Sequence, residues 1–244
     1  MNVVGVIDLR GGQAVHARGG IRHLYAPVRL PHCDAPGNAI ELARFYVEEL
    51  GIEELYVADL DAIQFRKPQH ALIDALVALG TPIWLDAGIV TASDADALTR
   101  GISRLVIGSE TLRSMTTPGE LASTVGGGRI AFSLDLTRGT LHTSHAGWHG
   151  KPERIAARVA DAGIGTLIVL DLARVGTGRG LDVDLLSRIR AEAPDIILLA
   201  GGGIVGPGDL RAAEEAGCDG VLVASALLDG RLTAADVRHA RSRR

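Results

Sequence analysis

The chain has 244 residues, of which 47% are hydrophobic and 22% charged. This composition supplies a sizeable core and excludes a disordered protein. Twenty-five Lys and Arg stand against 29 Asp and Glu, a net charge of −4, which argues against nonspecific attraction to nucleic acid or an anionic membrane. No apolar run reaches the ~18 residues of a membrane span, and two cysteines are too few for a disulfide framework, so we expect a soluble, cytoplasmic protein.

Short apolar runs alternate with segments of helical periodicity along the whole chain. The runs are continuous rather than alternating, which is typical of parallel strands covered on both faces. We expect strands, in chain order, at residues 3–7, 55–58, 83–85, 105–107, 130–134, 167–170, 196–199 and 221–223. Eight strand–helix units in this length favour one (β/α)₈ barrel over residues 1–244, rather than an open doubly wound sheet.

The segments between the strands carry helix signals. We expect helices at residues 38–50, 68–79, 152–162, 184–193 and 207–216. The patterns Ser93 to Asp96 and Thr233 to Asp236 are typical of capping boxes at helix starts. Glycine accepts the left-handed conformation that often ends a helix, and five glycines stand at predicted helix ends: Gly51, Gly80, Gly101, Gly163 and Gly217.

The second half of the sequence repeats the first. Residues 7–9, 57–60, 87–90 and 106–109 match residues 134–136, 169–172, 202–205 and 222–225, in the same order. Matches in the same order, at separations of about 112 to 127 residues, indicate internal duplication. We therefore expect two half-barrels, approximately residues 1–125 and 126–244.

Acidic residues follow five of the predicted strands, where a barrel of this kind carries its active site. Capping of the following helices, or pairing with nearby arginines, is the alternative explanation for a strand-end Asp. Strands one and five stand opposite each other, so Asp8 and Asp135 are expected to face across one mouth, where two carboxylates can divide acid and base roles. The five residues are Asp8, Asp59, Asp86, Asp135 and Asp171.

Small residues follow the last two predicted strands. Gly202 and Gly203 come after one strand, and Ala224 and Ser225 come after the next. Glycine lets the main chain approach an anion, and barrels commonly bind phosphate at this position. The sequence therefore predicts a phosphate site there; an ordinary tight turn is the alternative.

The matching positions of the first half are Gly88 and Ser109, which predict a second phosphate site. Asp86, however, aligns with Gly201. A carboxylate repels a phosphate unless a cation intervenes. Two outcomes therefore stay open: this second site binds phosphate, or it has lost that function or takes an amine. The loops after the first and fifth strands carry six basic residues. These residues either fold over the mouth and bind substrate or are solvated polar residues of exposed loops: His16, Arg18, Arg22, His142, His145 and His149.

Together these motifs resemble the histidine-biosynthesis barrels, namely the phosphoribosylformimino-AICAR-phosphate isomerase and the cyclase subunit of imidazole glycerol phosphate synthase. The resemblance covers essentially the whole chain. For the isomerase it implies an intramolecular oxidoreductase that performs an Amadori rearrangement of an aminoaldose phosphate to an aminoketose phosphate. The segments that carry it are residues 6–15, 58–62, 132–135 with Gly147 and Trp148, 200–204 and 220–223.

The resemblance also implies roles for single residues. Asp8 becomes the base and Asp135 the acid, whose pKa must be raised to hold a proton at neutral pH. Main-chain N–H groups around Gly202, Gly203, Ala224 and Ser225 anchor a phosphate of a small metabolite. Trp148 either stacks on a planar base or fills the core. No metal and no organic cofactor is implied.

The sequence also departs from both enzymes of this family. Both enzymes carry polar residues at two positions of the mouth where this sequence has Leu170 and Val175. Residues 18–28 are also unlike the corresponding segment of those enzymes. These departures resemble a divergent branch found in methanogens and in bacteria with methanopterin-type one-carbon cofactors. The alternatives to the isomerase are therefore a related enzyme of another pathway, such as a synthase or lyase of one-carbon cofactor biosynthesis, and a binding protein without turnover. The number of subunits stays open.

Overall fold

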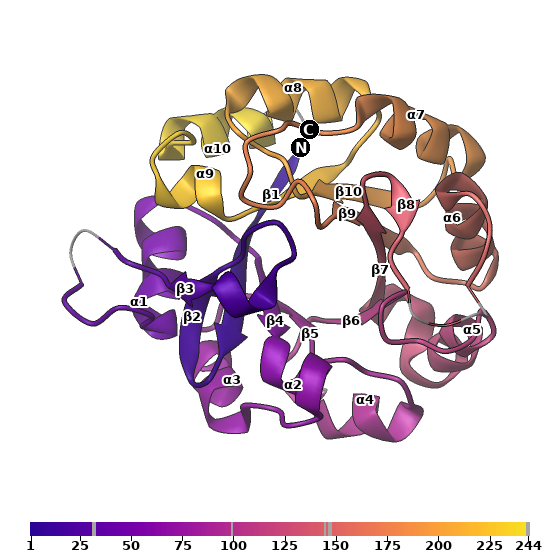
Figure 1. The fold of residues 1–244 in the computed structure, drawn as a ribbon, viewed down its shortest axis with the longest axis horizontal. Helices are drawn as coiled ribbons and strands as arrows, with labels where there is room; N and C mark the ends of the chain where they lie inside the picture. Colours follow the sequence, from indigo (N-terminus) through magenta and orange to yellow (C-terminus); the bar gives the residue numbers. More distant parts are fainter. Residues whose placement is uncertain (31–32, 99, 144, 146–147, 243–244) are drawn as a thin grey trace.

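A closed barrel of parallel strands forms the centre of the molecule (Figure 1). The computed structural model describes residues 1–30, 33–98, 100–143, 145 and 148–242. Within these residues β1 is followed around the barrel by β4, β5, β6, β7, β9, β10 and β11, and β11 pairs with β1 to close it. The predicted (β/α)₈ architecture is confirmed. The strands are β1 Asn2–Arg10, β4 Leu55–Asp59, β5 Ile83–Asp86, β6 Arg104–Gly108, β7 Ile130–Thr137, β9 Thr166–Asp171, β10 Ile197–Gly201 and β11 Gly220–Val223.

Helices surround the barrel (Figure 1). All five predicted helices are present, although the first, α1, continues as a π-helix over Phe45–Glu49. The five predicted terminal glycines have positive φ, between 71° and 87°. The helices are α1 Ala39–Arg44, α2 Leu60–Phe65, α3 His70–Val77, α4 Ala92–Leu98, α5 Thr117–Leu121, α6 Pro152–Asp161, α7 Val183–Glu192, α8 Pro207–Glu215, α9 Ser225–Leu228 and α10 Ala234–Ser242.

One predicted helix start was wrong and another is confirmed. At α4 the reciprocal hydrogen bonds join Thr91 and Asp94, two residues before the predicted pair. Asp94 also accepts from the Val90 N–H at 3.0 Å, so this carboxylate satisfies two main-chain donors at once. At α10 the predicted pair, Thr233 and Asp236, makes the reciprocal bonds of a capping box.

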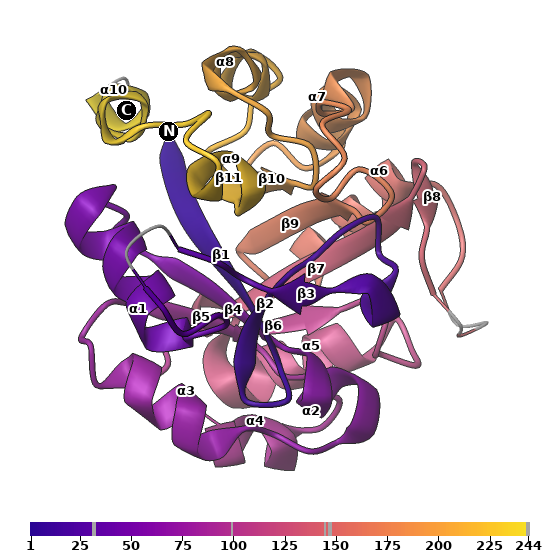
Figure 2. The ribbon, with the colours of Figure 1, turned by 60° about the vertical axis from the view of Figure 1, so that its left-hand side comes forward.

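Three short strands that we did not predict extend the barrel at its mouth. The strand β2 (Gln13–His16) runs antiparallel to the end of β1 and pairs in turn with β3 (Ala26–Pro27), and β8 (Thr140–Leu141) pairs with β7. They contain two to four residues, too few for a hydrophobic period. The β2–β3 connection, which carries a short 3₁₀ turn at Arg22–Leu24, supplies residues to the mouth (Figure 2).

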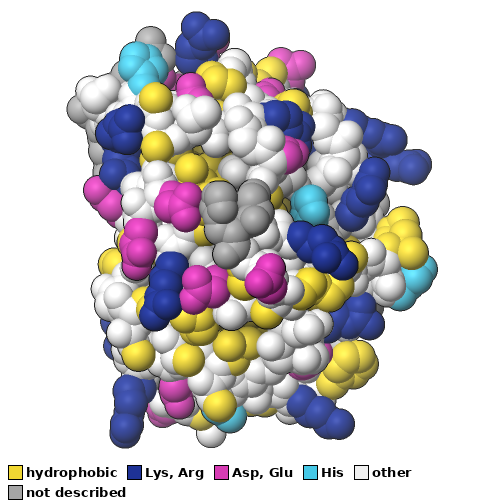
Figure 3. Space-filling view, turned by 90° about the vertical axis from the view of Figure 1, so that its left-hand side faces the viewer, with side chains coloured by type: hydrophobic (Ala, Val, Ile, Leu, Met, Phe, Trp, Pro, Cys, Tyr) yellow, Lys and Arg dark blue, Asp and Glu magenta, His cyan; other side chains and the backbone are white. Residues whose placement is uncertain are grey.

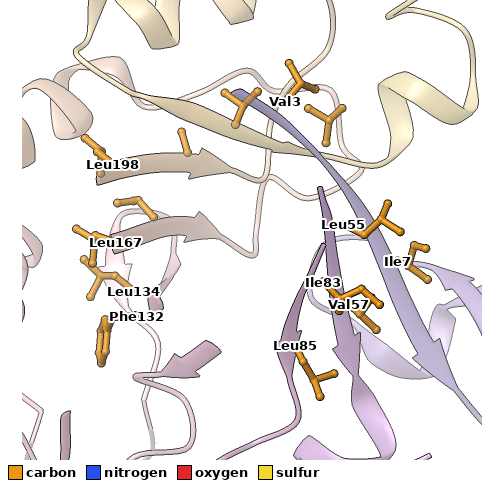
Figure 4. Packing of buried hydrophobic residues seen from close by; sticks show 14 of the residues in the cluster. Val3, Ile7, Leu55, Val57, Ile83, Leu85, Phe132, Leu134, Leu167 and Leu198 are labelled. Atoms are coloured by element: carbon orange, nitrogen blue, oxygen red, sulfur yellow. The ribbon is translucent and has the colours of Figure 1, made fainter. Parts of the chain in front are cut away.

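Two hydrophobic clusters follow from the alternation of side chains along each strand. The larger cluster lies between the strands and the helices and includes Val3, Ile7 and Phe132 (Figure 4). The smaller one fills the barrel interior and includes Val4, Tyr56, Trp84 and Leu222. Both faces of the sheet are therefore buried, which is why the strands read as continuous apolar runs.

Equivalent positions of the two halves make equivalent contacts. Asp94 accepts from the N–H groups of Val90 and Thr91, and Asp209 accepts from those of Val205 and Gly206. These contacts agree with an internal repeat, and the duplication itself stays a prediction.

The surface mixes charges. On the face shown in Figure 3, Lys and Arg side chains are interspersed with Asp and Glu. The chain ends meet near one another, since the Met1 amino group donates to the Ala240 carbonyl at 2.6 Å. None of the helices in the described residues combines the length and apolarity needed to cross a membrane.

Candidate active site

A cavity of about 240 Å³ lies at the carboxyl ends of the barrel strands. Asp8 and Asp135 both line it, although they come from β1 and β7, which occupy opposite positions in the barrel. Asp86, at the end of β5, lines it too. Three of the five predicted strand-end carboxylates therefore share one cavity.

Asp8 is poised to exchange a proton with a molecule in this cavity. Among the described residues its carboxylate makes no side-chain hydrogen bond, so a bound molecule can reach it. Burial raises the pKa of Asp8 to about 7; the Arg22 guanidinium opposes this rise and the Asp86 carboxylate adds to it. Near neutral pH the carboxyl group can therefore accept a proton and release it again.

Asp135 is held more firmly than Asp8. It is 6% exposed, and its carboxylate accepts from the Ser133 hydroxyl at 2.7 Å. Burial raises the pKa of Asp135 to about 8; the Ser133 hydrogen bond opposes this, while the Glu110 and Asp86 charges add to it. At neutral pH this carboxyl group keeps its proton more readily than Asp8 does, as a general acid must.

The other two strand-end carboxylates do not line the cavity and make the contacts of the alternative explanation, helix capping at Asp59 and arginine pairing at Asp171. Asp59 is fully buried and accepts from the Ala62 N–H at the start of α2 and from Gln69. Asp171 accepts from the N–H groups of Arg138 and Ala173. Asp171 also pairs with Arg174, whose Nε lies 3.3 Å from its carboxylate.

The β10–β11 end of the cavity, which we define by Gly202, Gly203, Ala224 and Ser225, presents open main chain. Gly203 has φ +148°, and a Cβ there would lie 2.2 Å from the Gly180 carbonyl oxygen, so a larger residue does not fit. Within the described residues the N–H groups of Gly203 and Ser225 donate to no other part of the chain. These donors are free for an anion.

Basic side chains gather at the same end. The His16 Nε2 and the Ser225 hydroxyl lie 2.6 Å apart. Burial lowers the pKa of His16, the Asp229 carboxylate opposes this, and the Arg18 and Arg231 charges lower it further. Arg231 itself lines the cavity, where its guanidinium is paired with the Asp229 carboxylate.

The β5–β6 end, which we define by Asp86, Gly88, Ser109 and Glu110, differs from the β10–β11 end in its main-chain hydrogen bonds. The Gly88 N–H donates to the Asp86 carboxylate at 3.1 Å, and the Ser109 N–H donates to the Ser133 carbonyl at 3.0 Å. Ser109 is fully buried, with its hydroxyl accepting from the Asp135 N–H. The donors that correspond to those of the β10–β11 end are therefore used within the chain.

Two side chains that the sequence analysis did not identify, Tyr56 and Glu110, also line the β5–β6 end. The Tyr56 hydroxyl donates to Asp86 at 3.2 Å, and Glu110 pairs with Arg22 at 2.7 Å. With the Gln64 amide oxygen turned toward Arg22, it accepts from Nη1 and Nε at 3.1 Å each. Burial raises the pKa of Asp86 to about 6, so this carboxylate is charged at pH 7.

One wall of the cavity is apolar. Leu170 and Val175, two of the positions at which the sequence analysis expects a departure from the histidine-biosynthesis enzymes, both line it, together with Ile204 and Leu222. Of the loop residues expected at the mouth, Arg22 and His142 line the cavity and His16 contacts Ser225. Arg18, His145 and His149 are not among the lining residues.

Trp148 lies in the core rather than in the cavity. It is 4% exposed, its indole N–H donates to the Leu112 carbonyl, and its ring centroid lies 5.2 Å from that of Phe132. It is not among the cavity-lining residues, so we assign it no contact with a ligand. Gly147, its partner in the sequence motif, lies outside the described residues.

Sequence reasoning missed Tyr56, Tyr25 and Glu110. Tyr56 lies in the middle of β4, where its neighbours on the strand are apolar, and nothing in the pattern shows that it points inward. Glu110 directly follows the Gly108–Ser109 pair, and that position was the one available signal. Among the described residues, no three His, Cys, Asp or Glu side chains are grouped so that they could hold a metal ion.

Comparison with known proteins decides the family. The histidine biosynthesis protein family matches residues 2–233 of the sequence. The chain belongs to this family. A relative from Deinococcus radiodurans is 34% identical over 94% of this chain and 94% of its own length, and one from Thermus thermophilus is 32% identical over 95% and 96%.

The names of these relatives describe their substrate. Both are named as isomerases of an imidazole-4-carboxamide that carries two phosphoribosyl groups. A protein of Methanocaldococcus jannaschii that is named as uncharacterised is 29% identical over 94% of each chain. The relatives of this chain therefore include proteins with and without an assigned reaction.

Proposed function

We propose that this protein is an intramolecular aldose–ketose isomerase that carries out an Amadori rearrangement of a phosphorylated aminoaldose. The observation that carries the proposal is the pair of carboxyl groups, Asp8 and Asp135, that line one cavity from opposite sides of the barrel. Two further facts support it. Relatives across nearly the full length are named as isomerases of a phosphoribosyl compound, and the β10–β11 end offers free main-chain donors for a phosphate.

The reaction needs one acid and one base. Asp135 donates a proton to the ring oxygen as the sugar ring opens, which leaves a protonated Schiff base at the first carbon. Asp8 then removes the proton from the second carbon to give an enaminol. Protonated Asp8 returns a proton to the first carbon while the hydroxyl of the second carbon loses its proton to the Asp135 carboxylate, which gives the aminoketose and restores both groups. One proton has moved between neighbouring carbons, so no external oxidant or reductant takes part.

The phosphate anchors the substrate while this occurs. Free N–H groups of Gly203 and Ser225 and the nearby His16 bind one phosphate, which holds the reacting carbons between the two carboxyl groups. Binding energy from a part of the substrate that does not react is thus used for orientation.

Isomerisation can be followed by NMR in D₂O, with phosphorylated ribosylamines that resemble half of the relatives' named substrate. Asp8→Asn and Asp135→Asn are each expected to lower kcat by ~10² or more while ligand affinity changes little, because each removes a proton-transfer group and keeps its shape. Loss of binding, or turnover that survives both changes, would contradict the assignment. Binding without turnover by the unchanged protein would instead favour a phosphometabolite-binding protein.

A further inference from the structure

The two ends of the cavity have equivalent main-chain positions but unequal capacity for an anion. At the β10–β11 end the Gly203 N–H is free, whereas at the β5–β6 end the corresponding Gly88 N–H is already bound to the Asp86 carboxylate. The Ser225 N–H is free, whereas the Ser109 N–H is bound to the Ser133 carbonyl. A phosphate at the β5–β6 end would find no main-chain donor at these positions.

The charges at the β5–β6 end, like its hydrogen bonds, disfavour binding of a phosphate there. Asp86 and Glu110 both line the β5–β6 end of the cavity, and a phosphate placed there would meet two carboxylates. Arg22 lines the same end and is paired with Glu110 at 2.7 Å, so it compensates the charge of Glu110, and no ion pair of the described residues compensates Asp86. Like charges at close range in a partly desolvated cavity repel strongly.

The same groups suit a different kind of ligand. Asp86 and Glu110 are hydrogen-bond acceptors, and the pKa of Asp86, Asp8 and Asp135 is raised in part by neighbouring carboxylates. An N–H or O–H donor, above all a protonated amine, would satisfy these acceptors and relieve the repulsion.

We infer that the substrate carries a single phosphate, bound at the β10–β11 end, and that its opposite end meets Asp86 and Glu110 through amine or hydroxyl donors instead of a second phosphate. This inference rests on the proposed function and narrows its substrate. It separates the chain from the relatives whose named substrate contains two phosphoribosyl groups. Asp86 and Glu110 become the specificity-determining residues.

Binding measurements test this without relying on turnover. The probes are the doubly phosphorylated compound named for the relatives and its two singly dephosphorylated forms, titrated calorimetrically into the full chain. We expect one singly phosphorylated form to bind at least ~10-fold more tightly than the doubly phosphorylated compound, because its donor end is not repelled. Equal or tighter binding of the doubly phosphorylated compound would overturn the inference.

Variants of Asp86 and Glu110 distinguish the effect of their negative charge from the effect of their size. Asp86→Gly combined with Glu110→Ala should improve binding of the doubly phosphorylated compound by ~10-fold or more and leave the singly phosphorylated form within about 3-fold. Asp86→Asn, which keeps the shape, should give part of this gain. Asp161→Asn removes one negative charge at the exposed end of α6 and should change neither affinity. Thermal unfolding of each variant shows that it is folded.

Failure of this inference differs from failure of the proposed function. If the singly phosphorylated form binds but no variant or condition gives turnover, the isomerase proposal fails and the specificity assignment stands. If the unchanged chain restores growth of a histidine auxotroph that lacks the isomerase, it turns over the doubly phosphorylated substrate and the single-phosphate inference is wrong. Gain of growth by the Asp86→Gly, Glu110→Ala variant alone would support it.

Discussion

The β10–β11 and β5–β6 ends of the cavity follow the same course of main chain and differ in which groups occupy its donors. At one end Gly201 precedes the glycine pair and the N–H groups stay free; at the other end Asp86 stands at the matching position and takes the Gly88 N–H for itself. Similar backbone geometry therefore does not ensure similar binding. The Asp86 carboxylate places a negative charge and a hydrogen-bond acceptor where the other end has Gly201.

The largest expected difference between the two ends comes from adding a methyl group to each. A Cβ on Gly203 would lie 2.2 Å from the Gly180 carbonyl oxygen, and a Cβ on Gly88 would lie 2.9 Å from the Ile63 Cα. Both changes strain the chain by about 1–3 kcal/mol. Gly203→Ala should also weaken binding of ribose 5-phosphate by ~10² or more, because it distorts the anion site, whereas Gly88→Ala should leave it within about 3-fold.

Calorimetric titration, with thermal unfolding to show that each variant is folded, measures both effects. Equal losses of phosphate affinity in the two variants would mean that both ends bind phosphate, and the contrast between them would be wrong.

Ser109 and Ser225 stand at matching positions of the two ends, and their removal should have smaller and opposite effects: one variant should lose stability and the other phosphate affinity. Ser225→Ala removes a hydroxyl beside His16 and should weaken phosphate binding about 10-fold with little change in stability. Ser109→Ala leaves the buried Asp135 N–H without its acceptor, so it should lower the free energy of unfolding by about 1–3 kcal/mol without changing phosphate affinity. Urea denaturation and phosphate titration of both variants provide the check; a phosphate defect in Ser109→Ala would contradict the assignment.

The smallest expected effect is a shift of the pH profile by Asp86. The proposed mechanism requires Asp8, with a pKa of about 7, to be ionised as the base and Asp135, with a pKa of about 8, to be protonated as the acid. The ratio kcat/KM should therefore rise through about pH 7 and fall through about pH 8. Asp86 raises the pKa of both groups, so Asp86→Asn should move both limbs to lower pH.

The distant change Asp161→Asn is the matched control for this profile and should leave both limbs in place. Limbs that move to higher pH in Asp86→Asn would show that the Asp86 charge does not act on the two carboxyl groups.

Several parts of the site could be predicted because strand ends in this architecture converge. Asp8 and Asp135 were identified from their positions after opposite strands, and Gly203 and Ser225 from the pattern after the last two. Arg22 was expected only as a loop residue at the mouth. Its pairing with Glu110, 88 positions away in the sequence, leaves no local pattern, because it depends on how the β2–β3 connection lies over the barrel.

The start of α4 also shows that a local sequence pattern does not decide which of two possible contacts forms. Two patterns near the start of α4 satisfy the capping rule, and the fold uses Thr91 and Asp94 rather than Ser93 and Asp96. In that position Asp94 also receives the Val90 N–H and pairs with Arg66. These additional contacts of Asp94 come from residues outside the four-residue capping pattern.

The amino-acid sequence by itself determined the barrel, the order of its strands and the two carboxyl groups at its mouth, because apolar periodicity and strand-end chemistry are local properties of the chain. Only the tertiary structure decided which donors stay free. Whether the Gly88 and Gly203 N–H groups can bind a ligand depends on contacts with Asp86 and on the charges that other loops bring to each end. Such contacts join residues that the strand ends bring together in space, and no sequence period records them.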